Sequence, residues 1–194
     1  MDGALLTPVE VRAIHTIFEL EKPMFERKPL SWVEFETVST LDPAVIASYR
    51  SKSSVGNEIL LFHGTPLENQ PSILSSGFEI RPGMKGHIGT GIYLSDTLEQ
   101  ALYYQLKNEY TGQETHFRIL VCRVLLGNCT MRLRNSYADQ TITSDSYWTE
   151  YIQDWPKPRS KEYCVPNVAH ILPVGVVVLE CPKKDSKGYK RRKR

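Results

Sequence analysis

Three short segments of this chain place a histidine, a tyrosine and a glutamate beside apolar stretches. The segments are 60–65 (LLFHGT), 89–96 (GTGIYLSD) and 161–165 (KEYCV). His63 ends an apolar run, and Gly64 after it has no side chain, so the backbone there can approach a ligand closely. Glu162 opens a run suited to burial, and a carboxylate in such a place needs a partner or a chemical task. The three segments are therefore candidates for one polar site.

Two tyrosines could hold a flat heterocycle. Tyr93 and Tyr104 are eleven residues apart, the first on an expected strand and the second on the helix that follows. Two aromatic faces placed in this way suit a ring sandwiched between them. We choose Tyr104 over its neighbour Tyr103 because Tyr104 shares a helix face with Ala101 at the i, i+3 spacing.

Each motif taken alone has a structural explanation. A histidine at a strand end is often hydrogen-bonded in place, a tyrosine often packs in the core with a wet tip, and a glutamate often lies at a solvated edge. The order and spacing of the three segments favour one shared site over three unrelated ones.

In that order and spacing the segments resemble the catalytic domain of the poly(ADP-ribose) polymerase and diphtheria-toxin group of ADP-ribosyltransferases. The resemblance covers about residues 59–181, strongly at its two ends and weakly between 128 and 160. It implies an α+β ADP-ribosyltransferase fold, with two small, mostly antiparallel sheets around an NAD+ cleft and short flanking helices. It also implies transfer of ADP-ribose from NAD+, the substrate, to a macromolecule, with release of nicotinamide and without a metal.

The resemblance assigns the catalytic roles to His63, Tyr93 and Glu162. It implies that His63 bonds the adenine-side ribose, that the Gly64 backbone grips the nicotinamide carboxamide, and that Glu162 bonds the nicotinamide ribose and stabilises its cationic transition state. Further NAD+-binding positions implied by it are Thr65, Gly77, Arg81, Ala101 and Tyr104.

Two positions depart from the family pattern. Ala101 stands where many members have a serine that bonds the carboxamide, and Glu79 stands where many have a basic residue near the adenosine. Each lost hydrogen bond costs about 1 kcal/mol, or roughly fivefold to tenfold in affinity.

The glycine-rich stretch 83–91 matches the family's donor loop; it lacks the residue order of a P-loop or of a Rossmann fingerprint.

Two other functions stay open. RNA 2′-phosphotransferases share a related fold, a His-Gly-Thr start and the use of NAD+, but they would want further Arg and His residues where this chain has 91–93 (GIY). The domain could instead be an inactive module that binds NAD+, ADP-ribose or a protein, and Ala101 and Glu79 favour that alternative. Within the transferase hypothesis, mono-ADP-ribosylation is slightly favoured over poly, and a protein acceptor over a nucleic acid.

Local patterns predict the elements that would position these residues. Thr7 and Glu10 predict a capping box, with Pro8 at the first helical position, that opens a helix over 8–20, and Gly77 is expected to end another helix as its C′ residue. Residues 96–99 (DTLE) read as a second capping box, before the helix that carries Ala101 and Tyr104. We also expect a helix over 43–49 and strands over 59–63, 92–95, 162–165 and 171–179. A central strand over 117–126 should be buried on both faces, and 30–38 should be a strand or an irregular segment. Between 128 and 160 we expect no firm element, only turns near 155–158.

Length and composition fit one catalytic domain with extensions. The chain has 194 residues, 41% apolar and 24% charged, and four cysteines without metal-site spacing. We expect a lead-in over 1–58 packed on the domain, an ADP-ribosyltransferase domain over 59–182 and a disordered tail over 183–194. The tail holds eight Lys or Arg against one Asp, which suits import machinery ahead of nucleic acid. With no secretory signal and no long apolar run, we expect a nuclear or cytoplasmic protein that does not contact membranes.

Overall fold

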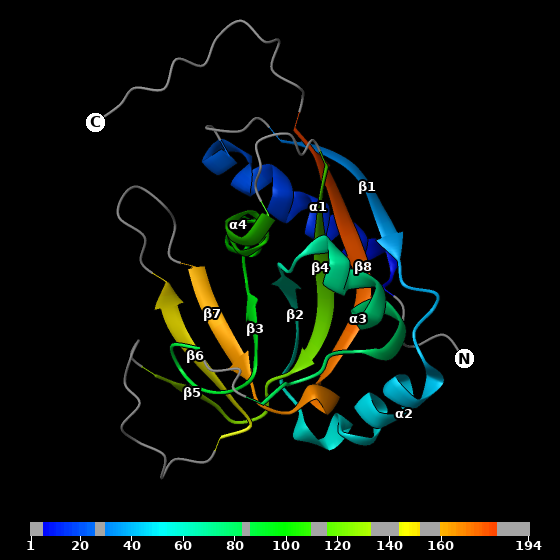
Figure 1. Ribbon diagram of the computed structural model, residues 1–194, viewed down its shortest axis with the longest axis vertical. Coiled ribbons are helices and arrows are strands. Elements are labelled where there is room, and N and C mark those ends of the chain that lie inside the picture. The colour runs from blue at the N-terminus through cyan, green and yellow to red at the C-terminus, as the bar shows by residue number, and fades with distance from the viewer. Residues whose placement is uncertain are drawn as a thin grey trace, which may run out of the picture.

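The computed structural model describes residues 6–25, 30–82, 86–109, 116–132, 144–151 and 160–181. Within these ranges, four α-helices flank a central sheet (Figure 1). They are α1 (Pro8–Glu21), α2 (Pro43–Ser51), α3 (Gln70–Ser76) and α4 (Leu98–Glu109). The strands are β1 (Ser31–Thr37), β2 (Glu58–His63), β3 (Ile92–Ser95), β4 (His116–Leu125), β5 (Cys129–Met131), β6 (Ser146–Tyr151), β7 (Ser160–Val165) and β8 (Ile171–Glu180).

The strands form one eight-stranded sheet in the order β1-β8-β4-β2-β3-β7-β6-β5. Neighbouring strands are antiparallel except β5 and β6, which are parallel. The two halves of this sheet meet at β2 and β3, through the single pair Phe62 and Ser95. The α+β class is confirmed, but the two separate sheets expected from the sequence are joined here into one, because this one pair bridges them.

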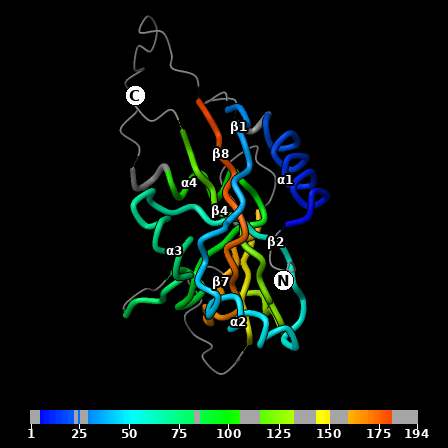
Figure 2. Tube along the Cα trace, turned by 90° about the vertical axis from the view of Figure 1, so that its right-hand side faces the viewer, coloured from blue at the N-terminus to red at the C-terminus, as the bar shows by residue number. Residues whose placement is uncertain are grey.

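The central strand β4 carries the core on both of its faces. Ile119 and Val121 point into a cluster that holds Phe18 of α1 and Leu98 of α4. The alternate residues of β4, among them Leu120, belong to a second cluster against which α3 packs. Figure 2 shows α1 and α3 on opposite sides of the sheet. The prediction of a central strand buried on both faces is confirmed, because a strand covered on both faces carries apolar residues at nearly every position.

Two predicted helix ends are confirmed in detail. The backbone N–H of Glu10 donates to the Thr7 hydroxyl at 3.2 Å, and the Glu10 carboxylate accepts from the Thr7 backbone at 2.7 Å, so the capping box is complete. Gly77 ends α3 with φ +77°, and its N–H bonds the carbonyl of Ile73. Glycine adopts this left-handed conformation without strain.

The N-terminal segment packs against the same sheet as the rest. The β1 strand pairs along β8 with a bulge between Trp32 and Glu34, and Arg123 of β4 bonds both Glu10 of α1 at 2.7 Å and Glu58 of β2 at 3.0 Å. The predicted division into lead-in, catalytic domain and tail stays a prediction, and the tail over 183–194 lies outside the described residues.

Two local predictions were wrong. Strands β5 and β6 lie between 128 and 160, where the sequence predicts no firm element. β5 is only three residues long, and in β6 buried Tyr147 and Thr149 alternate with half-buried Trp148. The capping box over 96–99 does not form, because Asp96 instead accepts from the Lys161 backbone of β7 at 2.8 Å. The turns predicted near 155–158 lie outside the described ranges.

Candidate active site

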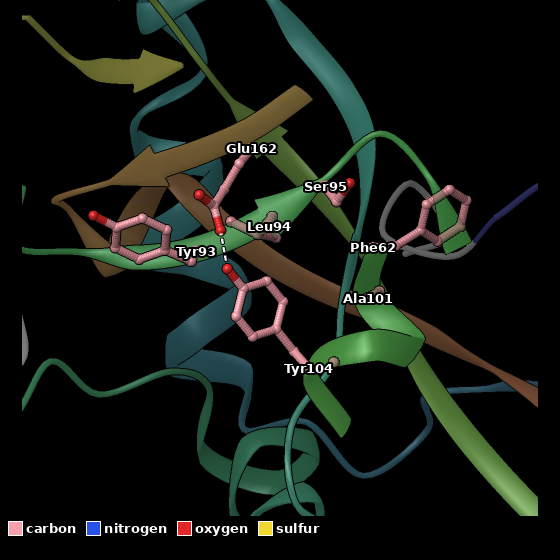
Figure 3. Close-up of a pocket in the computed structure, with 8 residues that line it drawn as sticks. Phe62, Tyr93, Leu94, Ser95, Ala101, Tyr104 and Glu162 are labelled. Atoms are coloured by element: carbon pink, nitrogen blue, oxygen red, sulfur yellow. Dashed lines mark hydrogen bonds between the residues drawn. The ribbon is translucent and has the colours of Figure 1, made fainter. Parts of the chain in front are cut away.

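A cavity of about 280 Å³ collects all three motifs. It is lined by His63, Gly64, Gly86, His87, Gly91, Ile92, Tyr93, Tyr104 and Glu162. A smaller pocket of about 10 Å³ adjoins it, with Ala101 and Ser95 on its wall alongside four residues of the larger cavity (Figure 3). Residues from β2, β3, α4 and β7 therefore converge where the two halves of the sheet meet.

His63 is held in one tautomer by the backbone. Its Nδ1 lies 2.7 Å from the carbonyl oxygen of Tyr93, which can only accept, so Nδ1 carries the proton and Nε2 is an acceptor. Burial lowers the pKa of His63 below its ordinary value, although the Tyr93 carbonyl acts in the opposite direction. The Phe78 ring packs edge-on against the imidazole, with 5.0 Å between the centroids. The result is a neutral, fixed imidazole at the cavity wall.

Gly64 lets helix α4 approach the end of β2. A Cβ at this position would lie 1.7 Å from the carbonyl oxygen of Ala101, so only glycine fits. This contact sets the first turn of α4 directly against the cavity, which places Tyr104 one turn further along at its wall.

Tyr93 holds the loop that borders the cavity. Its hydroxyl accepts from the Ile88 N–H at 3.0 Å and donates to the Gly89 carbonyl at 2.8 Å. Arg132 donates to the Ile88 carbonyl at 3.0 Å, and its guanidinium lies 3.4 Å from the centroid of the Tyr147 ring. Burial, with Cys164 nearby, raises the pKa of Tyr93, so its hydroxyl stays neutral. The described part of the glycine-rich stretch 83–91 is thus tied to β3 and to the segment after β5.

Glu162 has one carboxylate oxygen held and one available. Its side chain is 1% exposed, and Oε1 accepts from the Tyr104 hydroxyl at 2.5 Å (Figure 3). The other oxygen, Oε2, is buried and has no hydrogen-bond partner among the described residues. A buried carboxylate oxygen in this situation is suited to accept from a hydroxyl group that enters the cavity.

The remaining predicted NAD+-binding residues lie apart from the cavity wall. Thr65 is buried and its hydroxyl accepts from the Asn69 amide at 3.4 Å, while Gly77 ends α3 and faces Val45 of α2. Arg81 is exposed and lies 3.5 Å from Glu79. None of Thr65, Gly77 and Arg81 lines the cavity as described, and their roles stay predictions.

Several lining residues were not singled out from the sequence. Gly86, His87 and Gly91 belong to the stretch 83–91 that resembles the donor loop, and Ile92 is the first residue of β3; no pattern distinguished these four from their neighbours as lining residues. The choice of Tyr104 over Tyr103 agrees with the geometry, since Tyr103 is 40% exposed and does not line the cavity.

Neither a metal-ligand cluster nor a membrane-spanning helix occurs in the described ranges. No group of three or more His, Cys, Asp or Glu side chains there could hold a metal ion. No helix in those ranges has both the length and the apolar character needed to cross a bilayer.

Comparison with known proteins agrees with this geometry. The family model for the poly(ADP-ribose) polymerase catalytic domain matches residues 10–176. The chain is 35% identical over 95 residues to protein mono-ADP-ribosyltransferase PARP4 of Mus musculus, covering 44% of this chain and 5% of that protein. It is 26% identical over 145 residues to poly(ADP-ribose) polymerase 2-A of Oryza sativa subsp. japonica, covering 73% and 21%. It is 30% identical over 134 residues to poly(ADP-ribose) polymerase 2 of Arabidopsis thaliana, covering 67% and 20%.

The chain thus spans about a fifth of the two plant relatives and 5% of the mouse protein. The match includes all three motifs and most of α1, and the predicted ADP-ribosyltransferase fold is confirmed. This chain belongs to the poly(ADP-ribose) polymerase catalytic domain family.

Proposed function

We propose that this domain transfers ADP-ribose from NAD+ to a macromolecular acceptor and releases nicotinamide. The observation that carries the proposal is the buried carboxylate of Glu162, which has one oxygen held by Tyr104 and the other without a described partner. It shares its cavity with the neutral imidazole of His63 and the ring of Tyr93.

The reaction breaks the bond between the nicotinamide nitrogen and C1′ of the ribose. Nicotinamide leaves with the bonding electron pair, and positive charge develops on the ribose as an oxocarbenium-like state. A fixed carboxylate near that charge stabilises the transition state more than the ground state. The acceptor then forms the new bond to C1′ and gives up its proton.

The other residues of the cavity would orient NAD+. Nε2 of His63 is an acceptor suited to a ribose hydroxyl, and Gly64 lines the cavity, where its backbone would bond the nicotinamide carboxamide as the family resemblance implies. The rings of Tyr93 and Tyr104 are suited to the two faces of nicotinamide. We further propose NAD+-binding roles for Thr65, Gly77 and Arg81, as the family resemblance implies.

The finer assignments rest on the sequence. We propose mono transfer slightly ahead of poly transfer, a protein acceptor ahead of a nucleic acid, and a nuclear or cytoplasmic location with the basic tail as an import signal. The name of the mouse relative refers to mono transfer and those of the plant relatives to poly transfer, so the names alone do not decide between the two.

One observation favours an inactive binding module instead. Ala101 lines the small pocket beside Gly64 and has no hydroxyl to offer a carboxamide. One missing hydrogen bond weakens binding by roughly fivefold to tenfold, which does not abolish transfer.

The test is incubation of the protein with NAD+ labelled on its adenylate half. Label that becomes covalently attached to protein or nucleic acid in the parent, but not in Glu162→Ala, supports the transferase. Label that never becomes attached, together with measurable NAD+ binding, would instead identify a binding module. Loss of phosphate from 2′-phosphorylated RNA without label transfer would identify a phosphotransferase.

A further inference from the structure

Two carboxylates are buried among the residues that the structure describes, and only one lies in the cavity. The second is Glu21, the last residue of α1, which is 5% exposed. It continues the buried stripe of Ile14 and Phe18, a position where an apolar residue would be expected. A carboxylate buried in an apolar stripe is costly unless it has strong hydrogen-bond donors.

The donors for Glu21 come from the start of α4. Oε1 accepts from the Leu98 N–H at 3.2 Å, and Oε2 accepts from the Glu99 N–H at 2.9 Å. These are the first two N–H groups of the helix, for which no carbonyl of the helix itself is available. A negative charge at this end also interacts favourably with the helix dipole.

The local sequence leaves these two N–H groups to Glu21. Thr97 precedes the helix, and its hydroxyl accepts from the third N–H group, that of Gln100, at 3.4 Å. The cap of α4 is therefore divided between a neighbouring threonine and a glutamate 77 positions earlier in the chain.

Helix α4 carries Ala101 and Tyr104, so the cap at its start affects the cavity that these two residues border. The carbonyl of Ala101, in the first turn of α4, packs on Gly64. The hydroxyl of Tyr104, in the next turn, donates a hydrogen bond to Glu162. A shift of the first turn of α4 would move both contacts, and small displacements of positioning groups strongly affect reaction rates.

We propose that Glu21 is a positioning residue for ADP-ribose transfer, which acts by capping α4 and so fixing Tyr104 and Ala101 against the cavity. This inference rests on the proposed function and makes the N-terminal helix part of the catalytic unit. Glu21 itself does not line the cavity.

The test compares Glu21→Ala and Glu21→Gln with Glu19→Gln in the full chain. Glu19 lies in the same turn of α1, but its side chain is 46% exposed and pairs with Lys22, so it is a matched control. The measurements are hydrogen exchange of peptides over 97–105 and 171–180, the midpoint of thermal unfolding, kcat and KM for NAD+, and the dissociation constant for nicotinamide.

We expect the exchange over 97–105 to accelerate about tenfold in Glu21→Ala, the change typical of a lost helix cap, while 171–180 exchanges as before. We expect kcat to fall by about tenfold or more, with partial retention in Glu21→Gln, whose amide oxygen still accepts one bond. Glu19→Gln should match the parent. If Glu21→Ala does not fold, Glu21→Gln alone decides, since it keeps the side-chain volume.

Unchanged exchange over 97–105, equal acceleration in both peptides, or an unchanged kcat beside faster exchange would each overturn the proposal. If the parent transfers no ADP-ribose, the proposed function fails separately. The role of Glu21 is then tested by nicotinamide binding: if the cap positions the site, the dissociation constant should rise about fivefold in Glu21→Ala. An equal dissociation constant in parent and variant would count against the role of Glu21.

Discussion

The hydroxyl of Tyr104 donates a hydrogen bond to Oε1 of Glu162, 58 positions later in the sequence, at 2.5 Å. This contact links helix α4 to strand β7 across the cavity. It fixes one carboxylate oxygen of Glu162 and leaves Oε2 for a group that enters the site.

Replacing Tyr104 by phenylalanine separates its two proposed roles. The ring remains to stack, but Glu162 loses a bond worth about 1–3 kcal/mol to a buried charge. We expect kcat to fall about tenfold while KM for NAD+ changes little, as steady-state kinetics would measure. Tyr103→Phe, at the exposed neighbouring position, should leave both constants unchanged. A Tyr104→Phe enzyme as fast as the parent would show that the hydroxyl does not matter.

Ala101→Ser should restore a hydrogen-bond donor beside Gly64. Ala101 is 2% exposed and lines the small pocket, so a hydroxyl there would be shielded from bulk water. We expect nicotinamide to bind roughly fivefold to tenfold more tightly, by about 1 kcal/mol, in isothermal titration. Weaker binding than the parent would mean that the pocket does not accept the carboxamide.

The imidazole of His63 should resist protonation. Because burial lowers its pKa, the ring is less than half protonated at pH 6.5, the ordinary value for histidine. Below that pH the unfolded chain takes up this proton first, so the folded state loses stability as the pH falls. Titration of the ring by NMR gives the midpoint directly. A midpoint above 6.5 would contradict the neutral, accepting Nε2.

The ionisation of Glu21 should change the stability of the folded state with pH in the direction opposite to that of His63. Burial raises its pKa to about 7, against the two N–H groups that bond it, and nearby Glu99 and Asp96 add to the rise. From pH 7 down to about 4.5 the folded state holds a proton that the unfolded chain lacks, so the free energy of unfolding increases as the pH falls through 7.

We expect this contribution to be about 2 kcal/mol between pH 8 and pH 5.5 and to be absent in Glu21→Gln. Urea unfolding of parent and variant at both pH values measures it. The difference between the two proteins is the relevant quantity, since His63 and His170, whose pKa values are lowered, act in the opposite direction. Identical changes with pH in the two proteins would rule out the assignment to Glu21.

The parts of the fold that could be predicted from the sequence depend on neighbours a few residues apart. Thr7 and Glu10 define the start of α1 between them, and the ends of β3 were predicted to the residue. The placement of Tyr104 at the cavity follows from helix periodicity and from its distance to Tyr93. Such relations are set by local geometry, so a single sequence contains them.

The parts that could not be predicted depend on distant partners. Residues 96–99 have the composition of a capping box, yet Asp96 bonds β7, and Glu21 supplies the cap for the N–H groups of Leu98 and Glu99. The union of the two halves into one sheet rests on the pair Phe62 and Ser95. No local pattern tells a side chain which of two available donors it will reach.

The most direct test of the central claim is the rate of nicotinamide release from saturating NAD+ by the parent and by Glu162→Gln. Glutamine has nearly the same shape and can still accept from Tyr104, but it carries no negative charge. If the carboxylate stabilises the cationic transition state, the variant should still bind NAD+ while kcat falls by about 100-fold or more. Nicotinamide release at the parent rate by Glu162→Gln would contradict the account.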